Sequence, residues 1–379
     1  MERLLENDFD KSAKALLDVE KNMLEVNWMA SSRRKFVQGC LAAVGAAALG
    51  YLGSARHSHA WLGAPAAGPL DGGSGQSGGT REPGYLALER SGELERREQA
   101  LKEMLKECRL CPRRCGVNRM AGEEGVCSVG DSFKVASHGP HFGEEPPLVG
   151  RRGSGTIFFS NCNLLCVFCQ NWQINHRGDG QQTSHAELAR MMLALQRAGC
   201  HNINLVTPTH LAPHIVSALR LAAADGLRLP LVYNTSGYDS LELIRLLDGV
   251  VDIYLPDFKY QDEATAARFS NGAPGYPEHA AAAIREMHRQ VGVIRQTDGI
   301  AHGGLLIRHL VLPENMAGTD GFVRWVASEL GPETHVNIMG QFAPQFRAHE
   351  YPPLSRRPTR EELAQAMRWA REAGLRNLY

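Results

Sequence analysis

The chain has 379 residues, and 41 Lys and Arg balance 41 Asp and Glu, so its formal net charge is zero at pH 7. Hydrophobic residues make up 43% and charged residues 22%, which are ordinary proportions for a globular protein. The charge balance gives no reason to expect a nucleic acid or an acidic surface as partner, and we expect none. The length allows one domain of about 250 residues with extensions at either end.

Composition changes along the chain predict five segments. They are an N-terminal extension with an export signal (1–60), a linker rich in Gly, Pro and Ser (61–84), a helix followed by a four-cysteine module (85–150), an α/β core (151–345) and a C-terminal helical segment (346–379).

The N-terminal segment carries a twin-arginine pattern, Ser32-Arg33-Arg34-Lys35-Phe36-Val37, followed by an apolar run from Gly39 to Gly53. Ser58-His59-Ala60 then offers a small-x-small cleavage site, and together these features predict a twin-arginine export signal. The alternative is an uncleaved anchor or a vestigial signal, although the run is short for a membrane span. We expect translation to begin at Met29 rather than Met1, because the signal then has an ordinary length.

The charged stretch 85–107 is predicted to be helical. Beyond residue 155, short apolar runs alternate with longer amphipathic ones. Strands are expected at 155–160, 202–206, 230–234, 250–255, 305–311 and 335–339, and helices at 184–199, 211–224, 239–247, 277–290, 320–330 and 360–373. Six such β/α units predict a parallel sheet with helices outside, whereas a full barrel needs eight.

Nine cysteines are many for a reduced protein, and seven of them fall in two motifs. The first motif is Cys108, Cys111, Cys115 and Cys127, which make a complete tetrahedral ligand set. The Gly-rich interval 116–125 is turn-forming, so Cys127 can fold back on the others. We therefore expect a second metal here, with zinc and an iron–sulfur cluster both open, or otherwise a reduced or disulfide-linked set.

A polar stretch, Phe142-Gly143-Glu144-Glu145-Pro146-Pro147, follows His138 and His141. A buried, hydrogen-bonded His or a solvated Glu is the expectation here, rather than a catalytic group.

The second cysteine motif, Cys162, Cys166 and Cys169, follows the strand expected at 155–160. The thiols therefore lie at the carboxyl end of a strand, where α/β folds place their chemistry. Soft sulfur ligands select zinc, copper(I) or iron–sulfur, and three ligands leave one metal position open for a small molecule. The alternatives are a zinc knuckle closed by His176, or three buried cysteines.

This CxxxCxxC motif, with Phe168 before its last cysteine, resembles the radical S-adenosylmethionine (SAM) signature. The longer run from Phe158 to Trp172 resembles the branch named for pyruvate formate-lyase activating enzyme, and the resemblance extends over about residues 105–345. It implies a [4Fe–4S] cluster on Cys162, Cys166 and Cys169, SAM as cofactor, a reductant such as flavodoxin or ferredoxin, and an open (β/α)6 partial barrel.

Polar residues follow the expected strands where a SAM site would lie: Thr207, Thr209, Asn234, Thr235, Ser236, Asp257, Lys259 and Arg308. The resemblance implies that Asp257, Lys259 and the turn at Asn234 hold the methionyl carboxylate and the ribose, or a nearby cation. Two departures stand out. Asn234 replaces the family's Asp, and Thr207-Pro208-Thr209-His210 replaces the Gly-Gly-Glu that contacts the SAM amino group.

The resemblance implies reductive cleavage of SAM to a 5′-deoxyadenosyl radical that abstracts hydrogen from a substrate, with a glycyl residue of a partner enzyme as one candidate. The alternative is an exported iron–sulfur electron-transfer or metal-binding protein without SAM chemistry. The hypothesis of a zinc hydrolase has little support, because no His/Glu ligand pair lies near Cys162 in the sequence. No catalytic side chain is identified. The localisation stays open, because the signal predicts export to the periplasm or attachment to the membrane, whereas SAM and its reductants are cytoplasmic.

Overall fold

The computed structural model describes residues 82–379. The expected twin-arginine signal and the start at Met29 lie outside the described residues. Among the residues that are described, no helix has both the length and the apolar character needed to cross a membrane.

The first described elements are two helices, α2 (Gly84–Arg90) and α3 (Glu93–Lys106). The single helical segment expected at 85–107 is therefore wrong in one respect. The chain breaks at Gly92, whose φ of 74° is left-handed and suits only glycine without strain. Helix α3 buries Leu94, Leu101 and Leu105 and leads directly into Cys108.

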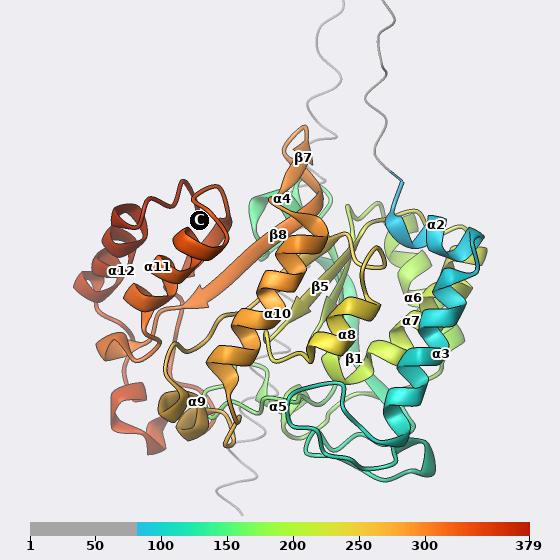
Figure 1. Ribbon diagram of the computed structural model, residues 1–379, viewed down its shortest axis with the longest axis horizontal. Helices are drawn as coiled ribbons and strands as arrows, with labels where there is room; N and C mark the ends of the chain where they lie inside the picture. The colour runs from blue at the N-terminus through green and yellow to red at the C-terminus, as the bar shows by residue number, and fades with distance from the viewer. Residues whose placement is uncertain (1–81) are drawn as a thin grey trace, which may run out of the picture. The chain divides into compact units, whose positions relative to one another are not determined.

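Six parallel strands form the centre of one sheet, and the α/β fold with an open, partial barrel is confirmed (Figure 1). They are β2 (Ser154–Phe159), β4 (Ile203–Val206), β5 (Leu231–Thr235), β6 (Ile253–Pro256), β8 (Ile300–Leu310) and β9 (His335–Met339). Neighbouring strands pair in that order, β2-β4-β5-β6-β8-β9, so the carboxyl ends meet at one edge.

The helices of the repeating units begin and end close to the positions expected from sequence. They are α6 (His185–Arg197), α7 (Ala212–Ala224), α8 (Leu241–Leu246), α10 (Tyr276–Val291), α11 (Thr319–Glu329) and α12 (Arg360–Glu372). Helices α6 and α12 start with capping boxes at Ser184 and Thr359. In Figure 1, α10 lies across the outer face of the sheet.

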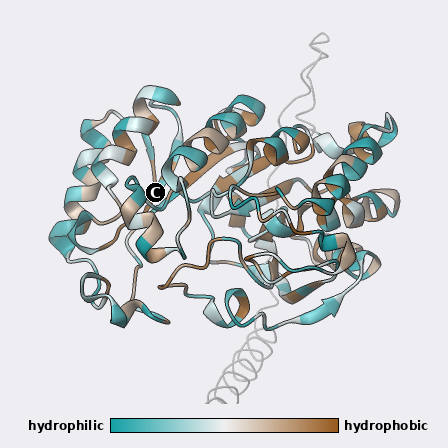
Figure 2. Cartoon of the chain, turned by 60° about the horizontal axis from the view of Figure 1, so that its bottom comes forward, coloured by the Kyte–Doolittle hydropathy of each residue, from teal (hydrophilic) through white to brown (hydrophobic). Residues whose placement is uncertain are grey.

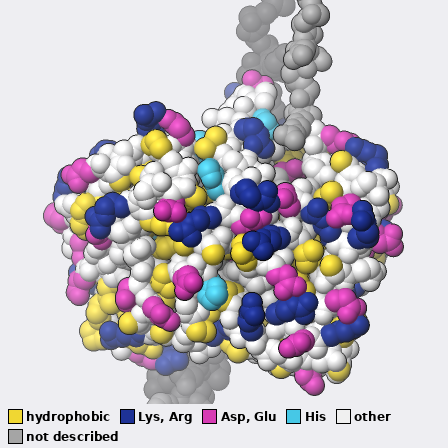
Figure 3. Space-filling model, viewed as in Figure 1, with side chains coloured by type: hydrophobic (Ala, Val, Ile, Leu, Met, Phe, Trp, Pro, Cys, Tyr) yellow, Lys and Arg dark blue, Asp and Glu magenta, His cyan; other side chains and the backbone are white. Residues whose placement is uncertain are grey.

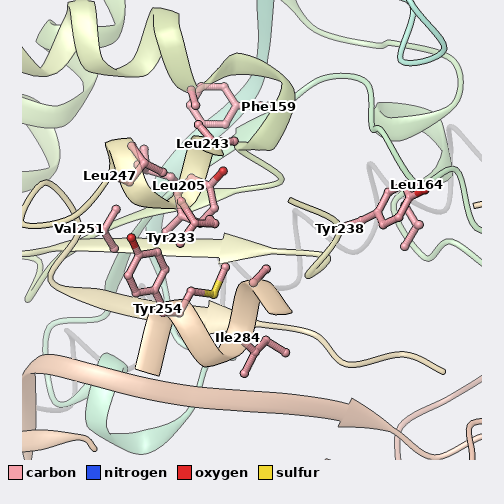
Figure 4. Close-up of a cluster of buried hydrophobic side chains, with 14 of the residues drawn as sticks. Phe159, Leu164, Leu205, Tyr233, Tyr238, Leu243, Leu247, Val251, Tyr254 and Ile284 are labelled. Carbon is pink, nitrogen blue, oxygen red and sulfur yellow. The ribbon is translucent and has the colours of Figure 1, made fainter. Parts of the chain in front are cut away.

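The core lies between the sheet and these helices. Tyr233 and Tyr254 of the strands lie in one buried cluster with Leu243 of α8 and Ile284 of α10 (Figure 4). The strands are accordingly the hydrophobic part of the cartoon in Figure 2, while the helices carry hydrophilic residues on their outer sides. On the face drawn in Figure 3, basic and acidic side chains are interspersed.

Four strands were not expected from sequence. Strand β1 (Phe133–His141) runs antiparallel to β2, and β3 (Gln181–Thr183) pairs with β1. Strands β7 (Arg295–Thr297) and β10 (Asn377–Leu378) pair with β8 and β9.

A short helix, α4 (Pro146–Val149), closes the amino-terminal end of the strands. Its Leu148 is fully buried, and the amide of Asn202 donates a hydrogen bond of 2.9 Å to the Leu148 carbonyl oxygen. Leu148 packs with strand residues on the inner face of the sheet, among them Val232, Ile253 and Leu306. The interior therefore opens toward the carboxyl ends, where the cysteine loop lies.

Candidate functional site: a thiol-lined cavity

The loop after β2 carries three thiols, and each one accepts a hydrogen bond. Leu164 N lies 3.3 Å from Cys162 Sγ, and Asn175 Nδ2 lies 3.3 Å from Cys169 Sγ. Ser270 Oγ, at the end of helix α9 (Glu263–Phe269), lies 3.1 Å from Cys166 Sγ. Donors aimed at sulfur favour the thiolate, which is the form that binds metal, but burial outweighs them and raises the pKa of Cys162 and Cys169. None of the three thiols is in a disulfide.

The backbone of this loop is held in an uncommon shape. Asn161 and Leu165 have left-handed φ values of 71° and 57°, which cost energy for residues other than glycine. The ring of His176 is engaged by the backbone of this loop, because its Nε2 lies 3.0 Å from the Cys166 carbonyl oxygen. The alternative of a zinc knuckle closed by His176 therefore lacks its fourth ligand in this arrangement.

Among residues 82–379, no three His, Cys, Asp or Glu side chains gather around a point where one metal ion would sit. A [4Fe–4S] cube takes its cysteines at separate corners, so it needs no such convergence. The donor set of three hydrogen-bonded thiols on one loop fits a cluster with one corner free of protein. The assignment of Cys162, Cys166 and Cys169 as cluster ligands stays a prediction.

A cavity of about 610 Å³ opens beside these thiols. It is lined by all three thiols and by seven of the eight residues that sequence placed at a SAM site: Thr207, Asn234, Thr235, Ser236, Asp257, Lys259 and Arg308. They come from the carboxyl ends of β4, β5, β6 and β8, as parallel strands require. Thr209 does not line the cavity. It is buried beneath it, with its Oγ1 3.1 Å from Thr235 Oγ1.

Lys259 and Asp257 form an ion pair of 2.6 Å in the cavity wall. Burial opposes the charged form of Lys259, but Asp257 and the neighbouring thiols of Cys166 and Cys169 outweigh it and raise the pKa of Lys259. An ammonium group thus lies next to the thiols and stays protonated.

The other charged group of the cavity is centred on Arg308. Its guanidinium donates to both carboxylate oxygens of Glu145, at 2.8 and 2.7 Å, and also to Glu144. Burial would raise the pKa of Glu145, but Arg308 and the amide of Asn337 hold it below its usual value. The expectation of a solvated Glu in this stretch is wrong, since the Glu145 residue is only 4% exposed and Glu144 is also largely buried.

Sequence reasoning missed a buried carboxyl group, Asp239. It accepts hydrogen bonds from Thr235 Oγ1 at 2.6 Å and from Tyr233 Oη at 3.0 Å, and burial raises its pKa. Together with Thr209 it fixes Thr235. Gly237 completes this turn with a φ of 77°, and a Cβ there would lie 2.3 Å from the Asp257 carbonyl oxygen. The turn is therefore packed directly onto the Asp257 strand.

The four-cysteine module lies against the Cys162 loop. Cys108 and Cys127 are buried, while Cys111 and Cys115 are half-buried, and none is in a disulfide. The backbone turns back as expected, since Cys108 N donates to Val117 O at 2.9 Å and Gly116 N to Cys108 O at 3.1 Å. Val126 N reaches Cys115 Sγ at 3.5 Å, so the Cys127 end does fold back. A metal at this module stays a prediction.

Comparison with known proteins identifies the class. The family model for the radical SAM superfamily matches residues 156–304. An uncharacterized protein of Methanocaldococcus jannaschii, MJ0674, is 33% identical over 296 residues, covering 76% of this chain and 80% of the relative. The chain belongs to the radical SAM superfamily. Membership implies an enzyme that uses a [4Fe–4S] cluster, SAM and a reductant.

Solved structures give partial likenesses. SuiB of Streptococcus suis, bound to its precursor peptide SuiA, has 11% identity and a TM-score of 0.38, covering 57% of this chain and 46% of SuiB. The radical SAM methyltransferase TsrM of Kitasatospora setae, with tryptophan and a SAM analogue, has 16% identity and a TM-score of 0.34, covering 47% of this chain and 34% of TsrM.

Proposed function

We propose that this radical SAM enzyme holds its cluster on Cys162, Cys166 and Cys169 and binds SAM in the adjoining cavity. When bound, these cofactors supply the chemistry: an electron from the cluster breaks the sulfonium C–S bond, and the resulting 5′-deoxyadenosyl radical takes a hydrogen atom from a substrate. One observation carries the proposal, namely three hydrogen-bonded thiols at one end of a cavity of about 610 Å³.

The charged groups around the cavity indicate the orientation in which SAM would bind. Lys259 lies beside the thiols, so its ammonium group is placed to bind the methionyl carboxylate, with Asp257 holding it in position. The turn Asn234–Ser236 lines the next strand end and offers polar groups for the rest of SAM. Thr209 and Asp239 act through Thr235, as positioning residues.

The Arg308 group is then left for the substrate. Arg308, Glu144 and Glu145 line the cavity but pair with one another rather than with the thiol loop. A preformed network of this kind holds its polar side chains in place in the cavity wall, so they need no further ordering when a ligand binds.

The resemblance of the Cys162 loop to pyruvate formate-lyase activating enzyme extends the proposal to a substrate class, a glycyl residue of a partner protein. The test is anaerobic incubation with the glycyl-radical proteins encoded in the same genome, followed by EPR spectroscopy. A glycyl radical signal that needs SAM supports this class. Transfer of a hydrogen atom from a small molecule to the 5′-deoxyadenosyl radical instead excludes it.

The electron is proposed to come from flavodoxin or ferredoxin. Export is proposed through the twin-arginine signal, and cell fractionation with N-terminal sequencing tests it. A full-length protein found in the cytoplasm would count against export without affecting the chemistry.

Anaerobic reconstitution with iron and sulfide, then addition of dithionite and SAM, tests the enzymatic proposal. We expect release of 5′-deoxyadenosine and a change in the EPR spectrum of the reduced cluster on adding SAM. The matched control is the triple variant Cys162→Ala/Cys166→Ala/Cys169→Ala, which should release none. An intact cluster with an unchanged spectrum and no 5′-deoxyadenosine would leave only the rival, an iron–sulfur electron carrier.

A further inference from the structure

The side chain of Arg113 attaches the four-cysteine module to the cluster loop. Arg113 donates four hydrogen bonds to carbonyl oxygens: to Asn163 at 2.6 Å, Leu164 at 3.3 Å, Ser270 at 3.1 Å and Asn271 at 3.0 Å. Two of these carbonyls lie between Cys162 and Cys166, and Ser270 is the donor to Cys166 Sγ. A residue between Cys111 and Cys115 therefore fixes the backbone of the radical SAM motif.

A second contact joins the two sets of thiols more directly. The side chain of Asn163, only 1% exposed, lies close to the thiol of Cys111. Its Nδ2 also donates to the Tyr238 carbonyl oxygen at 2.7 Å, which fixes the amide. Asn163 follows Cys162 in the chain, so the path from one thiol set to the other runs through one side-chain contact and one peptide bond.

The third observation is a buried cation without a carboxylate. Arg119 is fully buried, and its Nη1 and Nε donate only to the carbonyl oxygens of His210, at 2.7 Å, and Gly130, at 3.2 Å. Its Nη2 has no hydrogen-bond partner, and no ion pair with a carboxylate is present among the described residues. A guanidinium group cannot lose its charge, and an uncompensated buried charge is strongly unfavourable.

The group that can compensate Arg119 is the thiol set itself. Arg119 lies near the thiol of Cys127. Four thiolates around a metal centre carry net negative charge, so a filled centre would neutralise the cation, whereas four neutral thiols would not.

We infer that Cys108, Cys111, Cys115 and Cys127 hold a second iron–sulfur cluster that passes electrons to the radical SAM cluster through the contact between Cys111 and Asn163. The inference rests on the proposed function for its electron acceptor. A single zinc ion needs all four sulfurs about 2.3 Å from one point. No such gathering of Cys, His, Asp or Glu side chains exists among residues 82–379, whereas a cube takes ligands at separate corners.

The electron count balances with an external one-electron donor of the ferredoxin or flavodoxin class. That donor is oxidised as the second cluster is reduced. The second cluster is then reoxidised as the radical SAM cluster gains the electron that SAM consumes. Cys115 is less buried than Cys108 and Cys127, so the donor can approach on its side of the module.

The first experiment measures iron, zinc and sulfide in the full chain, in the triple variant Cys162→Ala/Cys166→Ala/Cys169→Ala, and in Cys111→Ser/Cys115→Ser. We expect each variant to keep about half of the iron of the unmodified protein, with an EPR signal after reduction. A triple variant that holds zinc, or no metal, overturns the inference. Neither result depends on SAM cleavage, so this readout stands even if the proposed function fails.

The second experiment tests the counter-charge. In Arg119→Met, the reduced second cluster loses a neighbouring positive charge, so its one-electron reduction should become at least tenfold less favourable. This is a fall of about 59 mV in midpoint potential. The control Arg114→Met removes an exposed guanidinium group from the same module and should shift the potential by much less. Equal shifts in the two variants would refute the role of Arg119.

The third experiment tests the path in Asn163→Leu. The rate of 5′-deoxyadenosine formation with flavodoxin as donor, divided by the rate of the same variant with dithionite, which reaches either cluster, should fall at least tenfold below that ratio in the unmodified protein. If Asn163→Leu changes the rate with flavodoxin by the same factor as the rate with dithionite, the relay is overturned. If dithionite also fails with the unmodified protein, the proposed function is at fault instead.

Discussion

The attachment of helix α3 gives a prediction whose magnitude follows from the structure. Glu98 on α3 is only 6% exposed and accepts three hydrogen bonds on its carboxylate. The donors are Ser217 Oγ at 2.6 Å and Arg220 Nη1 at 2.8 Å, both from α7, and Lys102 Nζ at 2.6 Å on α3 itself. Because α3 leads into Cys108, this carboxylate helps to place the four-cysteine module. The change to test is Glu98→Gln.

The size of the effect follows from the pKa of Glu98. Burial alone would raise it, but Arg220, Lys102 and Ser217 outweigh burial and lower it from 4.5 to about 2. At about 1.36 kcal/mol per pH unit, that shift corresponds to about 3.4 kcal/mol in the free energy of unfolding at pH 7. The side chains of Arg220 and Lys102 are 25% and 34% exposed, so solvent screens them, and we expect about 2–3 kcal/mol.

The lowered pKa of Glu98 also determines how its stabilisation of the fold changes with pH. Since the folded pKa is lowered, the stabilisation is complete above pH 4.5 and is lost as pH falls toward 2. The unscreened value of about 3.4 kcal/mol at pH 7 should fall to about 1.4 kcal/mol at pH 3, by the same relation.

Urea unfolding of the two proteins at pH 7, 4.5 and 3 measures this difference. The matched control is Glu103→Gln on the same helix, whose carboxylate pairs with Lys106 at the surface and should matter by less than about 0.5 kcal/mol. A loss in Glu98→Gln no larger than that of the control, or one that does not shrink with falling pH, would refute the reasoning.

Three further outcomes are expected. Lys259→Met should weaken SAM binding at least tenfold without loss of iron, as measured by SAM-dependent EPR changes, whereas Lys134→Met at an exposed position of β1 should not. Gly237→Ala should lower the free energy of unfolding in urea by at least about 2 kcal/mol, because its Cβ would lie 2.3 Å from Asp257 O at a left-handed φ. Unchanged stability would mean that the turn can shift. Arg308→Lys should destabilise the fold by about 1–3 kcal/mol in thermal unfolding, because an ammonium group cannot make both bonds to Glu145; an unchanged melting temperature would contradict this.

Much of the fold was predictable because its signals are local. The six parallel strands are apolar runs rich in β-branched residues, and Ser184 and Thr359 mark helix starts through their own neighbours. Strand β1 carries no such signal. Only its first residues alternate between buried and exposed, and its second half, around Gly139 and Pro140, is largely exposed and is held by pairing with β2. That pairing is a tertiary contact, which no local pattern reveals.

The candidate site divides in the same way. Cysteine spacing is visible over a few residues, and the strand-end positions follow from parallel topology, so seven of the eight expected SAM-site residues line the cavity. Glu145 and Arg308 are 163 residues apart, and their pairing depends on α4 entering the sheet interior. Glu144-Glu145 therefore looked like a surface pair in sequence. Asp239 was missed because it lies just beyond the turn residues, four positions from the hydroxyl of Thr235 that it binds.

The attachment of the four-cysteine module also shows which forces position it. Arg113 and Arg119 reach backbone carbonyls of the barrel, and Glu98 joins α3 to Arg220 of α7. Directed bonds of this kind fix orientation, whereas apolar contacts permit sliding. Oriented polar contacts at a module boundary are expected where relative position matters for function, and electron transfer between two centres is such a function. Apolar packing also holds the module, since Leu105, Leu110 and Val129 belong to the main hydrophobic core, but the polar contacts fix its orientation. This is the arrangement that the inferred electron route from Cys111 through Asn163 requires.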